Sequence, residues 1–135
     1  MAGFAESQPP ENHSKEPAGE DFQWEIDFFR GIVDTSPEYV DALVNLGNLY
    51  TQCGLYDLGL EIDRRLAKLR PDDAIVRYNL ACSLSLLENV DESLDELAKA
   101  IKLGYKDYKH MLHDDDLKNV RNERRFEELA SVIRP

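Results

Sequence analysis

Two segments, LVNLGNLY at residues 43–50 and RYNLACSL at residues 77–84, decide the fold because they lie 34 residues apart and match in character. Laying the chain on itself with that offset also places Pro37 on Pro71 and Leu69 on Leu103. Three further columns continue the pattern: Phe22, Tyr56 and Val90; Ile26, Leu60 and Leu94; and Ile32, Leu66 and Ala100. A period of 34 residues with two helices in each period predicts an array of stacked helix hairpins.

Helical spacing of the apolar residues extends from Asp21 almost to the end of the chain, and no stretch alternates with a period of two. We therefore predict an all-α fold. Ser36 and Pro37 are expected to open the second helix as its N-cap and its first residue. Asn89 and Glu92 have the spacing of a capping box and are expected to open the fifth. The predicted helices span approximately residues 21–34, 37–53, 56–69, 73–87, 89–103, 106–113, 115–120 and 123–133.

The spacing of the matched residues has a physical cause. Leu43, Leu46 and Tyr50 are three and seven residues apart, so they lie on one face of a helix and form a buried stripe. Gly47 and Ala81 are small at the points where the paired helices cross, which lets the two backbones approach closely. A single hairpin cannot cover its own apolar face, so neighbouring hairpins must stack.

This signature, Leu43-x-x-Leu46-Gly47-x-x-Tyr50, resembles the first helix of the tetratricopeptide repeat family, with Leu43 in place of tryptophan. The second copy, NLACSLSLLENVDESLDELAKAIKL at residues 79–103, keeps the pattern. The resemblance implies antiparallel helix-hairpin repeats wound into a right-handed α-solenoid. Residues that depart from the family pattern are Gly59 and Ser93 in place of Ala, Asp63 and Arg77 in place of large apolar side chains, and Tyr105 in place of the closing proline.

The chain is expected to hold one domain with capped ends. We predict an acidic, disordered tail over residues 1–20 and a helical domain over 21–135. The domain divides into a capping helix at 21–36, repeats at 37–72 and 73–105, and a closing cap at 106–135. Residues 104–129, GYKDYKHMLHDDDLKNVRNERRFEEL, are similar to an ending found in many bacterial tetratricopeptide proteins. Its apolar residues are expected to cover the last repeat: Leu117, Val120, Phe126, Leu129 and Ile133.

Composition narrows the classes of function. Lys and Arg total 16 against 27 Asp and Glu, which gives a net charge of −11 over 135 residues. Nucleic acids and anionic membranes would repel such a chain, so we expect neither as a partner. No apolar run approaches the ~18–20 residues of a membrane span, and residues 1–20 lack the pattern of a signal peptide. With two cysteines, the chain is expected to be a reduced cytoplasmic protein.

Residues that carry chemistry are few. His110 and His113 precede three aspartates, and that spacing could bring two imidazoles and a carboxylate to one metal. The favoured alternative is that Asp114 or Asp115 caps the next helix. Cys53 and Cys82 are interpreted as packing residues. The sequence has no nucleophile elbow and no phosphate-binding glycine loop, so we expect no enzyme, no catalytic residue, no cofactor and no metal.

The family resemblance implies a concave groove lined by the first helix of each repeat. By position, its lining residues are Val44, Asn48, Thr51, Tyr78, Asn79, Cys82 and Ser85. We expect this groove to bind a peptide or helix of a partner protein, with Tyr78 supplying contact area and asparagine amides supplying hydrogen bonds. Basic positions that some members use to grip a carboxylate are occupied here by Asp41 and Val44, so no carboxylate clamp is expected. The acidic charge favours basic partners, and a groove too short to bind anything by itself is the alternative.

The first helix offers a second surface. Phe22, Ile26, Phe29 and Val33 share one stripe, whereas Trp24 and Phe28 point to the opposite side. Large aromatic side chains in that position require a cover. A second copy of the chain, the tail through Phe4 and a foreign partner all remain open, and the first of these predicts a structural homodimer.

Overall fold

The computed structural model describes residues 19–135, which are helical apart from short connections and contain no strand. The helices are α1 (Gly19–Thr35), α2 (Val40–Gln52), α3 (Tyr56–Leu69), α4 (Ala74–Leu86), α5 (Val90–Lys102), α6 (Tyr108–His113) and α7 (Arg124–Ile133). A short 3₁₀ turn, η3 (Asp115–Leu117), lies between α6 and α7. The predicted all-α class is confirmed. The predicted tail lies outside the described residues except at its end, where α1 begins at Gly19.

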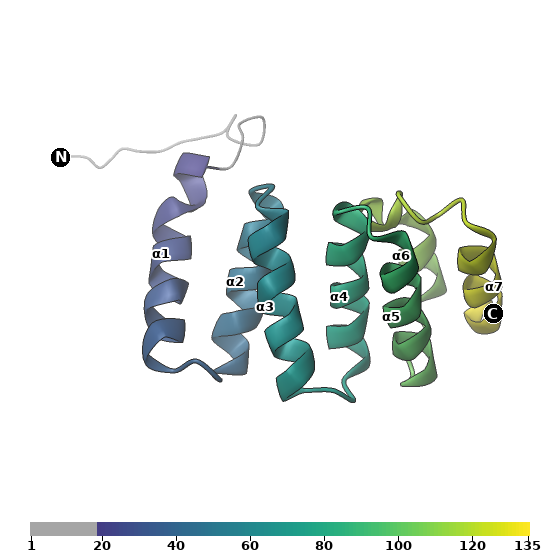
Figure 1. Cartoon of the computed structure of the whole chain (residues 1–135), viewed down its shortest axis with the longest axis horizontal. Coiled ribbons are helices and arrows are strands. Elements are labelled where there is room, and N and C mark those ends of the chain that lie inside the picture. The colour runs from purple at the N-terminus through teal and green to yellow at the C-terminus, as the bar shows by residue number, and fades with distance from the viewer. Residues whose placement is uncertain (1–18) are drawn as a thin grey trace.

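Successive helices follow one another along the long axis of the molecule, from α1 at one end to α7 at the other (Figure 1). The most extensive packing joins α4 to α5 and α2 to α3, as expected for two hairpins. The junction between the hairpins is formed by α3 and α4, and α1 packs against α2. This order of contacts is that of a helical repeat, because each helix packs mainly on its neighbours in the sequence.

Most of the matched apolar residues lie in the interior of the stack. Leu43, Leu46 and Tyr50 are buried in one core cluster, together with the inner stripe of α1. Gly47 lies where α2 crosses α3, since a Cβ atom there would be 3.2 Å from the Cγ2 atom of Ile62. The small residue thus allows the close approach of the two helices that the sequence predicts.

The helix predicted over residues 115–120 is only the 3₁₀ turn Asp115–Leu117, and two predicted N-terminal caps are wrong. The second helix begins at Val40, because residues 36–39 form a turn in which the Tyr39 amide donates to the Ser36 carbonyl at 3.0 Å. Asn89 precedes α5 but makes no side-chain capping bond. The Asn89 backbone amide, which a capping box would pair with Glu92, donates to the Leu84 carbonyl at 2.9 Å, and Glu92 pairs with the Arg64 guanidinium at 2.8 Å.

Two helices end at the glycines that the sequence places there. Gly54 and Gly104 have φ values of +78° and +114°, in the left-handed region that a helix stop requires. Glu88 takes the equivalent position after α4 with φ of 62°, which side chains other than glycine rarely adopt.

Ser93 and Arg77, two of the polar residues that depart from the family pattern, make hydrogen bonds within the stack. The Ser93 hydroxyl donates to the Ala81 carbonyl at 2.7 Å and so ties α5 to α4. Arg77 pairs with Glu96 at 3.0 Å and also donates to the Pro71 carbonyl at 3.0 Å. These bonds compensate for the apolar contacts that the substituted positions would otherwise make.

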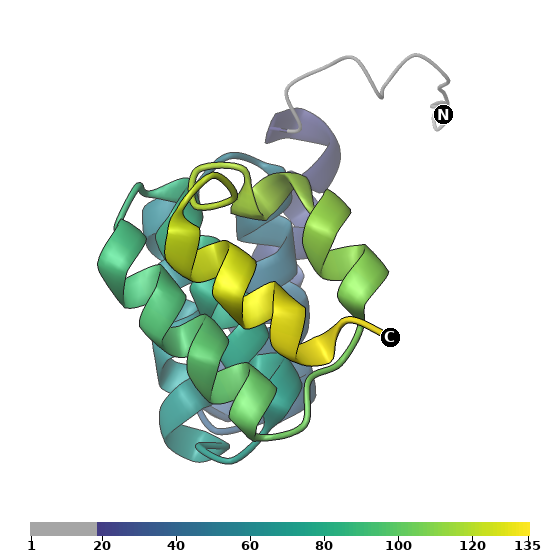
Figure 2. The same cartoon turned by 90° about the vertical axis from the view of Figure 1, so that its right-hand side faces the viewer.

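The closing cap consists of α6, η3 and α7. Leu117, Val120 and Phe126 are fully buried against the second hairpin, and Leu129 and Ile133 pack beside them, which confirms the predicted cover. Viewed from the end of the stack, α7 crosses between α5 and α6 (Figure 2). Polar contacts fasten this cap: Asn119 donates to the Ser85 carbonyl at 2.9 Å, and Arg125 pairs with Asp95 at 2.8 Å. Within residues 19–135, no helix is both long and apolar enough to cross a membrane.

Candidate binding groove

A cavity of about 310 Å³ opens between α2, α4 and the closing cap. We call it the acidic pocket, because three of its lining side chains are the carboxylates of Asp63, Asp114 and Asp116. The other lining residues are Asn48, Thr51, Gln52, Tyr78, Asn79, Cys82, Ser83, Leu86 and His110. The walls come from the first helices of both hairpins, from Asp63 on α3, and from the cap, which takes the place that a third repeat would occupy.

A second cavity, of about 530 Å³, adjoins the first and shares Tyr78, Asn79 and His110 with it. We call it the apolar pocket. Its remaining lining residues are Ala74, Ile75, Leu103, Gly104, Tyr105, Lys106 and Asp107. Ile75 is 56% exposed and Leu103 is 38% exposed, so this pocket presents uncovered apolar side chains. The two pockets are neighbours along α4, and we refer to them together as the groove.

Five of the seven residues predicted for the groove line the acidic pocket: Asn48, Thr51, Tyr78, Asn79 and Cys82. Val44 packs instead against the first core cluster. Ser85 is fully buried, because the cap lies over it and Asn119 bonds to its carbonyl group. That any of these residues contacts a partner stays a prediction.

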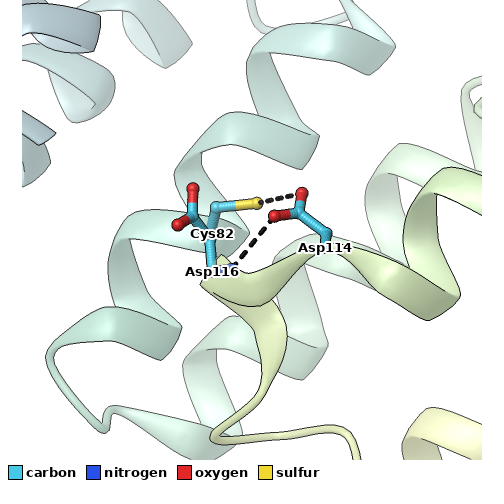
Figure 3. A group of neighbouring side chains, drawn as sticks. All are labelled: Cys82, Asp114 and Asp116. Carbon is cyan, nitrogen blue, oxygen red and sulfur yellow. Dashed lines mark hydrogen bonds between the residues drawn. The ribbon is translucent and has the colours of Figure 1, made fainter. Parts of the chain in front are cut away.

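Asp114 connects the cap to α4. Its Oδ2 atom accepts hydrogen bonds from the Tyr78 hydroxyl at 2.7 Å and from the Cys82 thiol at 3.6 Å. Its Oδ1 atom accepts from the Asp116 amide at 3.0 Å, so Asp114 caps η3 as the sequence predicts. The contacts to Cys82 and Asp116 are drawn in Figure 3. The Nε2 atom of His110 lies 3.2 Å from Oδ2 of Asp114.

Tyr78 is a wall of the groove more than an exposed contact surface. Its ring is buried and stacks on Tyr105, with 4.2 Å between centroids and 10° between planes. Burial, and then the neighbouring Cys82 and Asp114, raise the pKa of the Tyr78 hydroxyl. Burial followed by the Asp114 charge also raises the pKa of the Cys82 thiol well above its ordinary value. Both groups therefore stay protonated at neutral pH.

Asp63 lies in the wall of the acidic pocket, buried beneath α4. The Ser83 hydroxyl donates to its Oδ2 atom at 2.5 Å. Burial raises the pKa of the Asp63 carboxyl from 3.8 to about 7, against the smaller lowering effect of the Ser83 hydrogen bond. Burial, together with the charges of Asp114 and Asp115, also raises the pKa of Asp116. Sequence reasoning noted Asp63 as a departure but missed its place in the pocket.

The residues that could hold a metal differ in part from the predicted candidates, because Cys82 joins two of the aspartates in place of the histidines. Ligand atoms of Cys82, Asp114 and Asp116 all lie within 4.8 Å of one another, whereas His113 bonds through Nδ1 to the Lys109 carbonyl at 2.9 Å. The thiol and two carboxylates would suit a divalent ion such as Zn²⁺. The hydrogen bonds already made to Asp114 would compete with that ion.

The Asp63→Asn variant should change the pH dependence of stability. A carboxyl whose pKa is raised in the folded state stabilises the fold fully below about pH 4, and this contribution is lost as the pH rises to about 7. The amide oxygen still accepts the Ser83 hydrogen bond but carries no charge. We expect the variant to be more stable than wild type at pH 8, on the order of 2 kcal/mol in the free energy of unfolding by urea, and to differ little at pH 4.

Asp57→Asn, which changes an exposed carboxylate on the same helix, is the control and should not alter the pH profile. Equal pH profiles for wild type and Asp63→Asn would show that the Asp63 carboxyl does not hold its proton in the folded chain.

Comparison with known proteins points to the same architecture. No protein-family model matches the chain. It is similar to a chloroplastic protein of Arabidopsis thaliana, with 34% identity over 86 residues, which cover 62% of this chain and 26% of that protein. It is also similar to Superkiller protein 3 of Saccharomyces cerevisiae, with 31% identity over 74 residues, which cover 55% of this chain and 5% of that protein. The chain thus matches about a quarter or less of the length of these relatives. Both relatives contain tetratricopeptide repeats, which supports a tetratricopeptide-like family for this chain.

Proposed function

We propose that the chain is a tetratricopeptide-type protein-interaction module whose groove binds an extended segment of a partner protein. The two relatives and the stacked hairpins support the general role of an interaction adaptor. The observation that supports the groove as the binding surface is that its two pockets are neighbours and share Tyr78, Asn79 and His110 as lining residues. Each pocket has a volume in the ~300–1,000 Å³ range typical of ligand sites.

The chemistry of the lining supports binding rather than catalysis. An attacking thiol or hydroxyl needs a lowered pKa or an adjacent base that takes its proton. Cys82 and Tyr78 have raised pKa values, so neither is activated as a nucleophile, and their hydrogen bonds to Asp114 join α4 to the cap. We therefore propose a non-catalytic role without a cofactor.

A cytoplasmic location and the exclusion of nucleic acids and membranes remain part of this proposal. They rest on the net charge of −11 and on the ordinary thiol chemistry expected of two cysteines. The Arabidopsis relative is named as a chloroplastic protein, so the compartment of this chain needs its own measurement.

Asn79→Trp should block the groove, because Asn79 lines both pockets and an indole would fill the space between them. Peptides selected from a random display library against the full chain serve as probes. We expect their affinity, measured by fluorescence anisotropy, to fall roughly tenfold or more in this variant. Asn45→Trp is the matched control, because Asn45 occupies the same repeat position on α2, is exposed, and lines neither pocket. Unchanged affinity in Asn79→Trp would place the binding surface elsewhere.

A structural homodimer through α1 is the second candidate function. Trp24 and Phe28 are 68% and 55% exposed on the outer face of α1, at the end of the stack. Gly31 follows on the same face, and a Cβ atom there would meet nothing within 4 Å. This combination of two aromatic rings and a small residue would let another helix approach. The predicted cover by Phe4 of the tail lies outside the described residues.

Replacing both Trp24 and Phe28 with alanine should disrupt such a dimer. Sedimentation velocity of the wild-type chain would show a dimer that becomes a monomer in the double variant, because the exchange removes most of the apolar area on that face. Val132→Ala is the control, since Val132 is equally exposed, at 68%, near the opposite end of the stack. A wild-type chain that stays monomeric at high concentration, or a double variant that still dimerises, would exclude this candidate.

A further inference from the structure

The acidic pocket brings three carboxyl groups together. Asp63, Asp114 and Asp116 line it, and no lysine or arginine is among its described lining residues. His110 is the one basic side chain on that lining, and its Nε2 atom faces the Asp114 carboxylate. A pocket of this kind is complementary to a cation.

Arginines near the groove are engaged elsewhere. Arg121 donates to the backbone carbonyl of Asp114 and not to its carboxylate. Arg77 pairs with Glu96, and Arg64 pairs with Glu92, both on α5. The chain therefore does not supply its own cation to the pocket through these side chains.

Unpaired carboxylates in this position are costly when ionised. Asp63 is buried with one hydroxyl as its donor, and Asp116 lies half-buried beside two other aspartates. An ammonium or guanidinium group offers several N–H donors together with a positive charge, and it would satisfy carboxylates that the fold leaves without a cation.

The residues that line the groove suit a long side chain. The uncharged part of the lining includes Leu86, Thr51 and the ring of Tyr78, against which a hydrocarbon stem can pack while its charged end reaches the aspartates. Next to it, Ile75 and Leu103 leave apolar surface exposed in the apolar pocket. A guest that fits both pockets therefore joins a cationic side chain to a large apolar one.

We infer that the groove selects a partner segment that places a lysine or arginine side chain in the acidic pocket and a neighbouring large apolar side chain in the apolar pocket. This inference rests on the proposed function, since it names the class of segment that the interaction module recognises. It assigns Asp63 and Asp116 as specificity-determining residues, a role that their position in the sequence does not reveal.

A display library of random peptides, selected against the full chain in the presence of a metal chelator, tests the inference. Lysine or arginine should be enriched at one position, with a large apolar residue enriched nearby. A selected peptide is then compared with its acetyl-lysine or citrulline counterpart, which keeps the stem and removes the charge. We expect the neutral peptide to bind roughly tenfold more weakly.

The matching change in the chain is Asp63→Asn with Asp116→Asn, which removes two pocket carboxylates and keeps their shape. Affinity for the charged peptide should fall roughly tenfold or more, and the charged and neutral peptides should then bind alike. The control, Asp57→Asn with Asp91→Asn, makes the same change of net charge at two exposed positions off the lining and should retain the preference.

The outcomes distinguish this inference from the proposed function. Peptides bind in the groove if their affinity falls in the Asn79→Trp variant. If such peptides show no preference for lysine or arginine, this inference is overturned and the proposed function stands. Failure to select any groove-dependent peptide would overturn both. Without a chelator, tight binding of Zn²⁺ alone that is lost in Asp63→Asn with Asp116→Asn would make a metal ion the occupant, and the inference would be wrong.

Discussion

The hydrogen bond between the Tyr78 hydroxyl and the Asp114 carboxylate joins residues 36 positions apart and holds the closing cap against α4. Two repeats alone would leave the apolar side of the last hairpin open, because each hairpin needs a neighbour. The cap supplies that neighbour through Leu117, Val120 and Phe126. The hydrogen bond from Tyr78 to Asp114 of the cap is short and charge-assisted. This bond therefore both attaches the cap and fixes its position on α4. The groove exists because this segment stands where a further repeat would begin.

The repeat period made most of the fold predictable from the sequence, since 34-residue spacing in several independent columns leaves few alternatives to stacked hairpins. The inner stripe of α1 and the cover of the last repeat follow from the same pattern. Local capping signals were less reliable. Ser36 and Pro37 form a turn before α2, and Glu92 pairs with Arg64 instead of closing a capping box with Asn89. In both cases, residues outside the helix determine where it begins and how it is capped. Such contacts cannot be read from a single sequence.

Only part of the groove could be predicted. Positions taken from the repeat placed Asn48, Asn79 and Cys82 on the lining, because the first helices of both hairpins face the same side. The cap then changed what two of the predicted residues do: it buried Ser85 and turned Tyr78 into a wall. Asp116 comes from the cap and Asp63 from the second helix of a hairpin, so neither appears in a pattern based on first helices. The acidic character of the site arises from contacts between segments that are distant in the sequence.

We conclude that the Tyr78–Asp114 contact locks the cap onto the repeats. A double-mutant cycle with Tyr78→Phe and Asp114→Ala measures it most directly, because the loss of the η3 cap in Asp114→Ala cancels in the cycle. We expect a favourable coupling of about 1–3 kcal/mol in the free energy of unfolding by urea. Additive effects of the two substitutions, with no coupling between them, would contradict it.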